Sequence, residues 1–116
     1  MLYYLQKIHF NFKLSLNIIL YMSTETRDTI FIGKKPLMAY VTSTLIQLAN
    51  VPSVSIKARG LSIGRAVDVA QIVARKTENA GYSIGEIKID SESLESEDGR
   101  TRNVSTIEIE VKRNIE

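Results

Sequence analysis

The segment Ser53–Arg59 (SVSIKAR) alternates strictly between apolar and polar residues. Val54, Ile56 and Ala58 would share one face of a β-strand, because successive side chains of a strand point to opposite sides. Lys57 would lie on the other face, together with two further polar side chains. The pattern therefore predicts a strand with one buried face and one exposed, partly cationic face.

Two helices are predicted by apolar residues at helical spacing. The first begins at Pro36, whose missing N–H does no harm in a first turn, and runs to about Ala49. The second is preceded by Ser62, a good capping residue, and ends at Ala80-Gly81. Its apolar stripe contains small side chains that suit close packing on a sheet. The stripe consists of Ala66, Val69, Ala70 and Val73.

Three further strands are expected. A short β-rich run covers Thr29–Ile32, and Val104–Lys112 alternates between apolar and polar residues as clearly as Ser53–Arg59 does. The run Gly85–Asp90 also alternates, and this pattern predicts that Ile87 and Ile89 point inward.

The last two strands are predicted to form a long hairpin. The acidic, Ser-rich piece Ser91–Asp98 extends a strand beyond the body of the sheet, and Asp98-Gly99 is a strong turn signal. The element order is then β-α-β-α-β-β. We expect one α/β sandwich domain over residues 22–116, an α+β arrangement of a four-stranded mixed sheet with two helices on one face.

Residues 1–21 differ in composition from the rest of the chain. Seventeen of them are Leu, Tyr, Ile, Phe, Lys or Asn, the amino acids that A/T-rich codons favour. We expect a mis-assigned start or a disordered extension here, with Met22 as the true first residue. An amphipathic extension and a targeting segment are the alternatives, although polar residues interrupt any membrane span and no small-residue cleavage site follows.

Composition argues against catalysis. The chain has no cysteine and one histidine, His9, so neither a nucleophile–base pair nor a cluster of metal ligands can be assembled. Gly33-Lys34-Lys35-Pro36 lacks the upstream glycine and the Ser/Thr of a phosphate-binding loop. The acidic residues of the hairpin lack the spacing of a calcium loop. We expect no enzyme activity, no cofactor and no metal.

Charge is distributed unevenly along the chain. Residues 33–76 carry seven basic residues and one acidic residue, whereas residues 77–116 carry ten acidic and five basic residues. This asymmetry indicates a surface that faces a polyanion. Chance clustering of surface charge is the plain alternative.

The basic residues are expected at strand–helix junctions and at the hairpin tip. In the body they are Lys34, Lys35, Lys57, Arg59 and Arg65. Arg65, in the first turn of the second helix, would form a phosphate seat with the capping Ser62 and free N–H groups. Arg100 and Arg102 would reach into a minor groove. Taken singly, each body residue is also compatible with a solvated surface, and the arginines with a solubilising turn.

Three segments carry a family resemblance: IGKKPLMAYV (32–41), VSIKARGLSIGRAVDVAQIV (54–73) and DGRTRNVSTIEIEVK (98–112). With their spacing they resemble the archaeal Alba family over roughly residues 29–113. The resemblance implies a homodimer, or a heterodimer with a paralogue. It also implies binding of double-stranded DNA and RNA with little sequence preference, and a cytoplasmic location on the chromosome without membrane association.

The resemblance also assigns roles to residues. Lys34 and Lys35 match paired lysines at the centre of the family's binding surface, and Lys34 matches a position whose acetylation lowers DNA affinity, which implies a deacetylase partner. Arg100 matches the hairpin arginine that enters the minor groove. Leu61 replaces a common basic residue, and Thr77 replaces an aromatic used in dimer–dimer contacts.

Two other functions remain open from sequence. A dedicated RNA-binding protein, such as an RNA chaperone or ribonucleoprotein subunit, would use the same phosphate-reading surface. A protein-interaction module would pair through its hairpin, although lysine pairs and arginine tips suit phosphates better.

Overall fold

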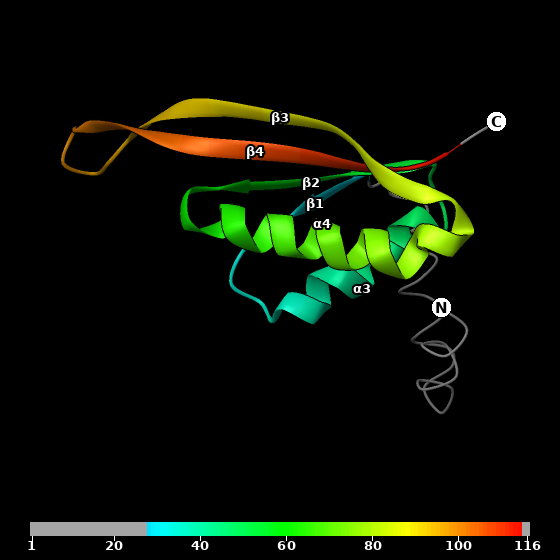
Figure 1. Ribbon diagram of the computed structural model, residues 1–116. Helices are drawn as coiled ribbons and strands as arrows, with labels where there is room; N and C mark the ends of the chain where they lie inside the picture. Colours follow the sequence, from blue (N-terminus) through cyan, green and yellow to red (C-terminus); the bar gives the residue numbers. More distant parts are fainter. Residues whose placement is uncertain (1–27, 115–116) are drawn as a thin grey trace.

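The computed structural model describes residues 28–114, which form a four-stranded sheet and two α-helices (Figure 1). Two 3₁₀ turns, η2 (Gly60–Ser62) and η3 (Glu78–Ala80), flank the second helix. The six main elements follow the predicted order: β1 (Thr29–Phe31), α3 (Leu37–Leu48), β2 (Ser53–Arg59), α4 (Ile63–Thr77), β3 (Tyr82–Glu95) and β4 (Thr101–Arg113). The expectations for residues 1–21 lie outside the described residues.

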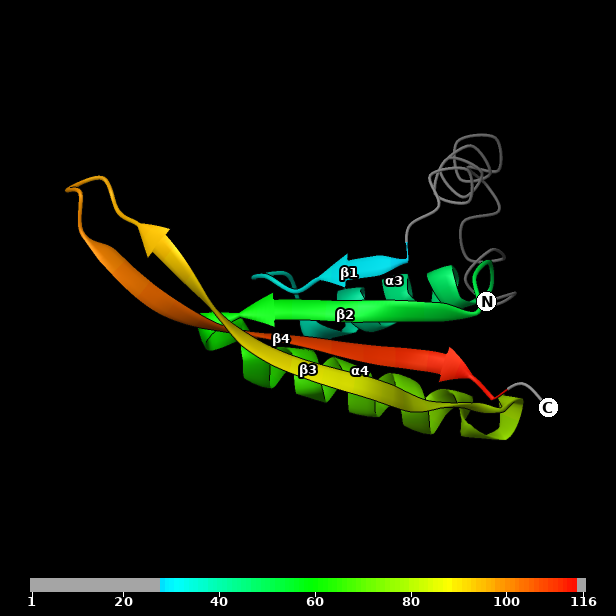
Figure 2. The same ribbon diagram turned by 90° about the horizontal axis from the view of Figure 1, so that it is seen from above.

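The sheet has the strand order β1-β2-β4-β3. β1 is parallel to β2, and the other neighbouring pairs are antiparallel, so the sheet is mixed as predicted. Both helices lie on one side of the sheet (Figure 1), and Figure 2 looks onto its other side, the open face. The predicted arrangement of two helices on one face is confirmed.

The core lies between the sheet and both helices, α3 and α4. Val54, Ile56 and Ala58 of β2 are buried, as the alternation predicted, and the predicted α4 stripe of Ala66, Val69, Ala70 and Val73 is buried as well. The alanines of this stripe leave room for the helix to approach the strands closely. Burying one side chain of the size of Ile56 stabilises the fold by about 1.5–3 kcal/mol.

The first helix begins one residue later than predicted. Pro36 precedes it, with φ of −54° and ψ of 142°, and its carbonyl accepts a hydrogen bond from the Ala39 N–H at 3.0 Å. The fixed φ of proline suits this position, and its missing N–H leaves no donor unsatisfied. The second helix ends at Thr77, before the predicted Ala80-Gly81, because the 3₁₀ turn η3 covers Glu78–Ala80; Gly81 after this turn adopts the left-handed conformation at φ 86°.

Both strands of the β3–β4 hairpin begin earlier than predicted, β4 at Thr101 rather than Val104, whereas β3 ends at Glu95 rather than Asp98. β3 begins at Tyr82 and contains a bulge between Ile84 and Ile87. At the bulge the Glu86 N–H donates to Glu110 Oε1 at 3.1 Å, and a Cβ on Gly85 would overlap that oxygen. A residue with a side chain at position 85 would therefore displace Glu110.

Beyond β2 the hairpin becomes a two-stranded arm. Arg59 at the end of β2 pairs with Thr106, so residues 91–95 of β3 and 101–105 of β4 pair only with each other. We call residues 91–105 the arm. Both views show it extending past the end of β2, which confirms the predicted protruding hairpin (Figures 1 and 2).

Ile87 and Ile89 lie on the predicted inner side of the sheet, but the expectation that they belong to the core is wrong. These side chains are 55% and 79% exposed. They pair with Ile109 and Ile107 and therefore share the helix-side face with them. β3 is an edge strand, however, and the described residues leave this part of its face uncovered.

No helix within residues 28–114 is long and apolar enough to cross a membrane.

Candidate nucleic-acid interface

The predicted basic residues of the body gather at one end of the molecule. The β1–α3 loop carries Lys34 and Lys35, β2 ends at Arg59, and Arg65 lies in the first turn of α4. Both ribbon views place this loop, the end of β2 and the start of α4 at the end from which the arm projects (Figures 1 and 2). We call this region the basic end.

Tyr40 shapes the loop that presents the two lysines. Its hydroxyl oxygen accepts hydrogen bonds from the Gly33 N–H at 2.9 Å and the Lys35 N–H at 3.0 Å. Tyr40 is buried in the first turn of α3, whereas the side chains of Lys34 and Lys35 are exposed. The phenol thus ties the loop to the helix and leaves both ammonium groups facing solvent. Helical spacing alone does not single out this tyrosine.

Arg65 braces the same loop. Its Nη2 donates to the Lys35 carbonyl oxygen, and its guanidinium carbon lies 5.9 Å from the centre of the Tyr40 ring. This distance is within the range of a cation–π contact. The side chain is therefore engaged by its own chain, and its role toward a phosphate stays a prediction.

The predicted capping role of Ser62 is wrong. Ser62 has φ of −82° and ψ of −6°, and its side chain makes no capping hydrogen bond. The reason is that η2 runs directly into α4, so Ser62 is already in a helical conformation rather than the extended one of a capping residue. The predicted phosphate seat consequently lacks its serine cap.

Lys57 and Arg59 point to the open face, as the alternation predicted, but acidic side chains accompany them. Lys57 Nζ lies 3.9 Å from Glu108 Oε1, and Arg59 Nη1 lies 3.2 Å from Glu92 Oε2. The Arg59 and Glu92 side chains are 63% and 51% exposed. Ion pairs this exposed contribute at most about 1 kcal/mol, so a phosphate can replace the carboxylate as partner.

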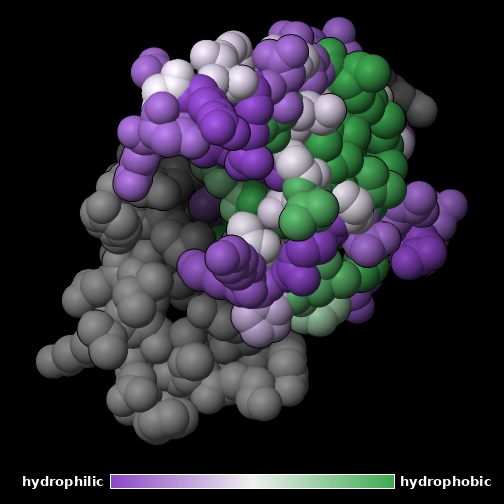
Figure 3. Space-filling view, turned by 90° about the vertical axis from the view of Figure 1, so that its left-hand side faces the viewer, coloured by the Kyte–Doolittle hydropathy of each residue, from purple (hydrophilic) through white to green (hydrophobic). Residues whose placement is uncertain are grey.

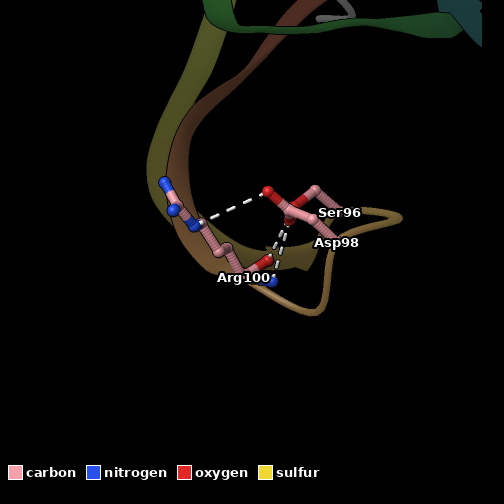
Figure 4. A network of polar contacts seen from close by, with 3 residues as sticks. All are labelled: Ser96, Asp98 and Arg100. Atoms are coloured by element: carbon pink, nitrogen blue, oxygen red, sulfur yellow. Dashed lines mark hydrogen bonds and ion pairs between the residues drawn. The ribbon is translucent and has the colours of Figure 1, made fainter.

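The tip of the arm is ordered by its own polar contacts (Figure 4). The Ser96 hydroxyl and the Arg100 N–H both donate to Asp98 Oδ1, and the Gly99 N–H donates to the Ser96 carbonyl at 2.9 Å. Gly99 has φ of 82°, a conformation that favours glycine. The predicted Asp98-Gly99 turn is confirmed.

Asp98 also sets the electrostatics of the tip. The hydrogen bond from Ser96, followed by that from the Arg100 N–H, lowers the pKa of the Asp98 carboxyl. Its Oδ2 lies 3.6 Å from Arg100 Nε. Arg100 and Arg102 are both exposed. The tip thus holds two arginines, one of them facing a carboxylate.

Within the described part of the chain, no group of three or more His, Asp or Glu residues is placed to hold a metal ion.

The comparisons with known proteins agree with this architecture. The family model described as Alba matches residues 28–91. The DNA/RNA-binding protein Alba of Nitrosopumilus maritimus is 94% identical over 93 residues, which are 80% of this chain and 98% of that protein. The chain belongs to the Alba family.

More distant relatives and solved structures extend the similarity. The DNA/RNA-binding protein Alba 1 of Archaeoglobus fulgidus is 49% identical over 83 residues, 71% of this chain and 91% of that protein. The solved structure of Alba from Thermoplasma volcanium is 44% identical, with a TM-score of 0.66, and the match covers 73% of this chain and 99% of that one. ALBA1 from Trypanosoma brucei, at 18% identity and a TM-score of 0.58, covers 75% of this chain and 69% of its own and shares the fold.

The structure places the two positions that were singled out from sequence, Leu61 and Thr77. Leu61 in η2 is fully exposed at the basic end. The Thr77 hydroxyl donates to the Val73 carbonyl at 2.7 Å, within its own helix.

Replacing Tyr40 with Phe should loosen the loop without changing any charge. Two backbone N–H groups lose their acceptor, so the free energy of unfolding should fall by about 1–3 kcal/mol. Amide hydrogen exchange at Gly33 and Lys35 should accelerate. Tyr82→Phe is the control, because its hydroxyl bonds the Leu48 carbonyl elsewhere in the fold. Equal exchange at positions 33 and 35 in both variants would contradict this role of Tyr40.

Replacing Ser96 with Ala should raise the pKa of Asp98 toward its ordinary value. The lost hydrogen bond is the largest cause of the lowering. An NMR titration of the Asp98 carboxyl carbon measures the change directly. A pKa that stays where it is, or falls, would show that Ser96 does not stabilise the carboxylate.

Proposed function

We propose that this chain binds double-stranded DNA and RNA without sequence preference, as a homodimer that coats or compacts the chromosome. The observation that carries the proposal is the gathering of the loop lysines, the β2 cations and the arm at one end of the molecule. The similarity to the DNA/RNA-binding proteins of Nitrosopumilus maritimus and Archaeoglobus fulgidus supports it.

In this proposal, binding depends on contacts between basic side chains and the phosphates of the nucleic acid. Lys34 and Lys35 are exposed at the centre of the basic end, where Tyr40 and Arg65 hold their backbone. Each phosphate neutralised by such a cation releases counterions, and the logarithm of the affinity then falls with the logarithm of salt concentration by about 0.9 per contact. Contacts to phosphates carry no sequence information.

The cations of β2 add contacts by exchanging partners. Lys57 and Arg59 are paired with Glu108 and Glu92 in the free chain, and all four side chains retain access to solvent. An approaching phosphate competes with the carboxylates for the same ammonium and guanidinium groups. The acidic residues therefore moderate the affinity of this surface.

The arm would follow the duplex away from the body. Arg100 and Arg102 are carried on a two-stranded ribbon beyond the end of β2. Arginine entering a minor groove responds to groove width and potential rather than to base identity. In a symmetric dimer two arms would reach along one duplex, roughly one helical turn apart.

An apolar surface along β3 and α4 supports the homodimer. Val67 of α4 and Ile84, Ile87 and Ile89 of β3 are 36–79% exposed. Figure 3 shows apolar side chains gathered on the side of the molecule that carries β3 and α4, at the right of that view. Contiguous exposed apolar surface typically marks an association site, and a second copy would cover it by the same residues on both subunits.

Lys34→Gln should weaken binding to a duplex and reduce the salt dependence, because one ammonium–phosphate contact is lost. We expect the slope of log affinity against log salt to become shallower by about 0.9. The substitution also mimics acetylation, by which we propose that the affinity is tuned through a deacetylase. Lys112→Gln, the same change at the opposite end of β4, is the control. Identical slopes for Lys34→Gln and the unaltered chain would reject the assignment.

Glu92→Gln should strengthen duplex binding, because Arg59 loses its competing carboxylate. We expect a gain of about two- to fivefold in affinity, the range of an exposed ion pair of up to 1 kcal/mol. Glu78→Gln makes the same charge change in η3, at the far end of α4. If both variants gain equally, net charge alone explains the effect and the ion pair has no role.

Ile89→Asp should convert the dimer to a monomer, because a charge within the apolar surface cannot be buried unpaired. Sedimentation velocity on the full chain measures the change. Leu61→Asp introduces the same charge at a fully exposed leucine off this surface and should leave the dimer intact. Persistence of the dimer in Ile89→Asp would place the interface elsewhere.

A further inference from the structure

Phe31 is a large aromatic side chain on the open face of the sheet. In β1 its neighbour Ile30 packs against the core, and Phe31 therefore points to the opposite side, where it is 72% exposed. Strand register places it directly beside Lys57 of β2. The fold does not need this ring, since an exposed position on a sheet is filled equally well by a polar residue.

Phe31 lines a hollow on this face of about 660 Å³. The hollow runs across the sheet from β1 to β3, and its lining includes Lys57, Arg59, Glu92 and Thr106. A volume of this size is typical of sites for small organic groups. Phe31 offers a flat aromatic face in this hollow, and polar side chains surround it.

The charges around the hollow fit a neutral polar ring better than a run of phosphates. Lys57, Arg59 and Lys88 are balanced by Asp90, Glu92 and Glu108. The carboxylates accept hydrogen bonds from the amino groups of nucleobases, and the cations donate to base oxygens. Bases in a duplex are stacked on both faces and turned inward, so only an unpaired base can enter.

We propose that the hollow binds an unpaired base of a single-stranded nucleic acid, stacked on Phe31. Flanking phosphates would meet Lys34 and Lys35, which follow Phe31 by three and four residues at the same end. Proteins that bind single strands combine aromatic stacking platforms with a cationic groove in this way. The inference rests on the proposed nucleic-acid binding and adds a second ligand form, bound through Phe31, to which the proposed duplex contacts give no role.

The test compares single-stranded and duplex ligands on the full chain. Fluorescence anisotropy is measured with a labelled unstructured 10-nucleotide RNA, the same sequence as DNA, and a 20-base-pair duplex. Phe31→Ala should lose about tenfold in affinity for both single strands, the loss of one base–aromatic stack. Its affinity for the duplex should change less than twofold.

Two further variants separate stacking from structure. Phe31→Tyr keeps the ring and should bind single strands like the unaltered chain. Met38→Ala truncates another exposed apolar side chain, on α3 rather than on the open face, and should also bind normally. The urea midpoint of each variant verifies folding, which the exposure of Phe31 leads us to expect unchanged.

The possible results lead to distinct conclusions. Undiminished single-strand binding by Phe31→Ala, or an equal loss for duplex and single strands, would overturn the proposal. Competition by adenosine monophosphate at the same nucleotide concentration as the RNA would also overturn it, since the site would then serve a free nucleotide. If the unaltered chain binds neither duplex nor single strands, the proposed function itself fails.

Discussion

The structure depends on the position of β2. This strand pairs with β1 on one side and β4 on the other, and its apolar residues Val54, Ile56 and Ala58 are buried beneath the helices. A slip of one residue would turn these side chains to solvent and bury Lys57 and Arg59, so packing fixes the register strongly. The same register places Phe31 beside Lys57, aligns Glu108 with Lys57, and marks where the arm leaves the sheet.

The parts of the fold that the sequence predicted well are those set by local periodicity. The alternation of Ser53–Arg59 and the stripe of α4 each follow from side-chain direction within one element, and both are confirmed. Ile87 and Ile89 show the limit of this reasoning. Alternation assigned them correctly to the helix-side face, but it contains no information on whether another element covers an edge strand.

The basic residues of the candidate site could be predicted from the sequence, but the residues that bind them within the fold could not. Basic residues at strand–helix junctions are visible from element boundaries alone. The contacts of Tyr40 with the loop, of Arg65 with the Lys35 carbonyl and of Glu92 with Arg59 join residues 5 to 33 positions apart, so they depend on the assembled fold. The capping prediction for Ser62 was wrong for a related reason. The 3₁₀ turn η2 connects the end of β2 directly to α4, and local sequence does not reveal this connection.

The surface at the basic end consequently combines cations with nearby carboxylates rather than presenting positive charge alone. Lys34 and Lys35 have a backbone fixed by Tyr40 and Arg65, whereas Lys57, Arg59 and Arg100 each face an acidic side chain in the free chain. Such a surface fits a ligand that is bound by many weak, exchangeable phosphate contacts and released again by competition.

The central claim is sequence-independent electrostatic binding, and a gel-shift titration of the full chain with two duplexes of unrelated sequence tests it most directly. At two salt concentrations, the account predicts equal affinities for the two duplexes and a steep, parallel weakening of both as salt rises. A strong preference for one sequence, or an affinity that does not respond to salt, would contradict it.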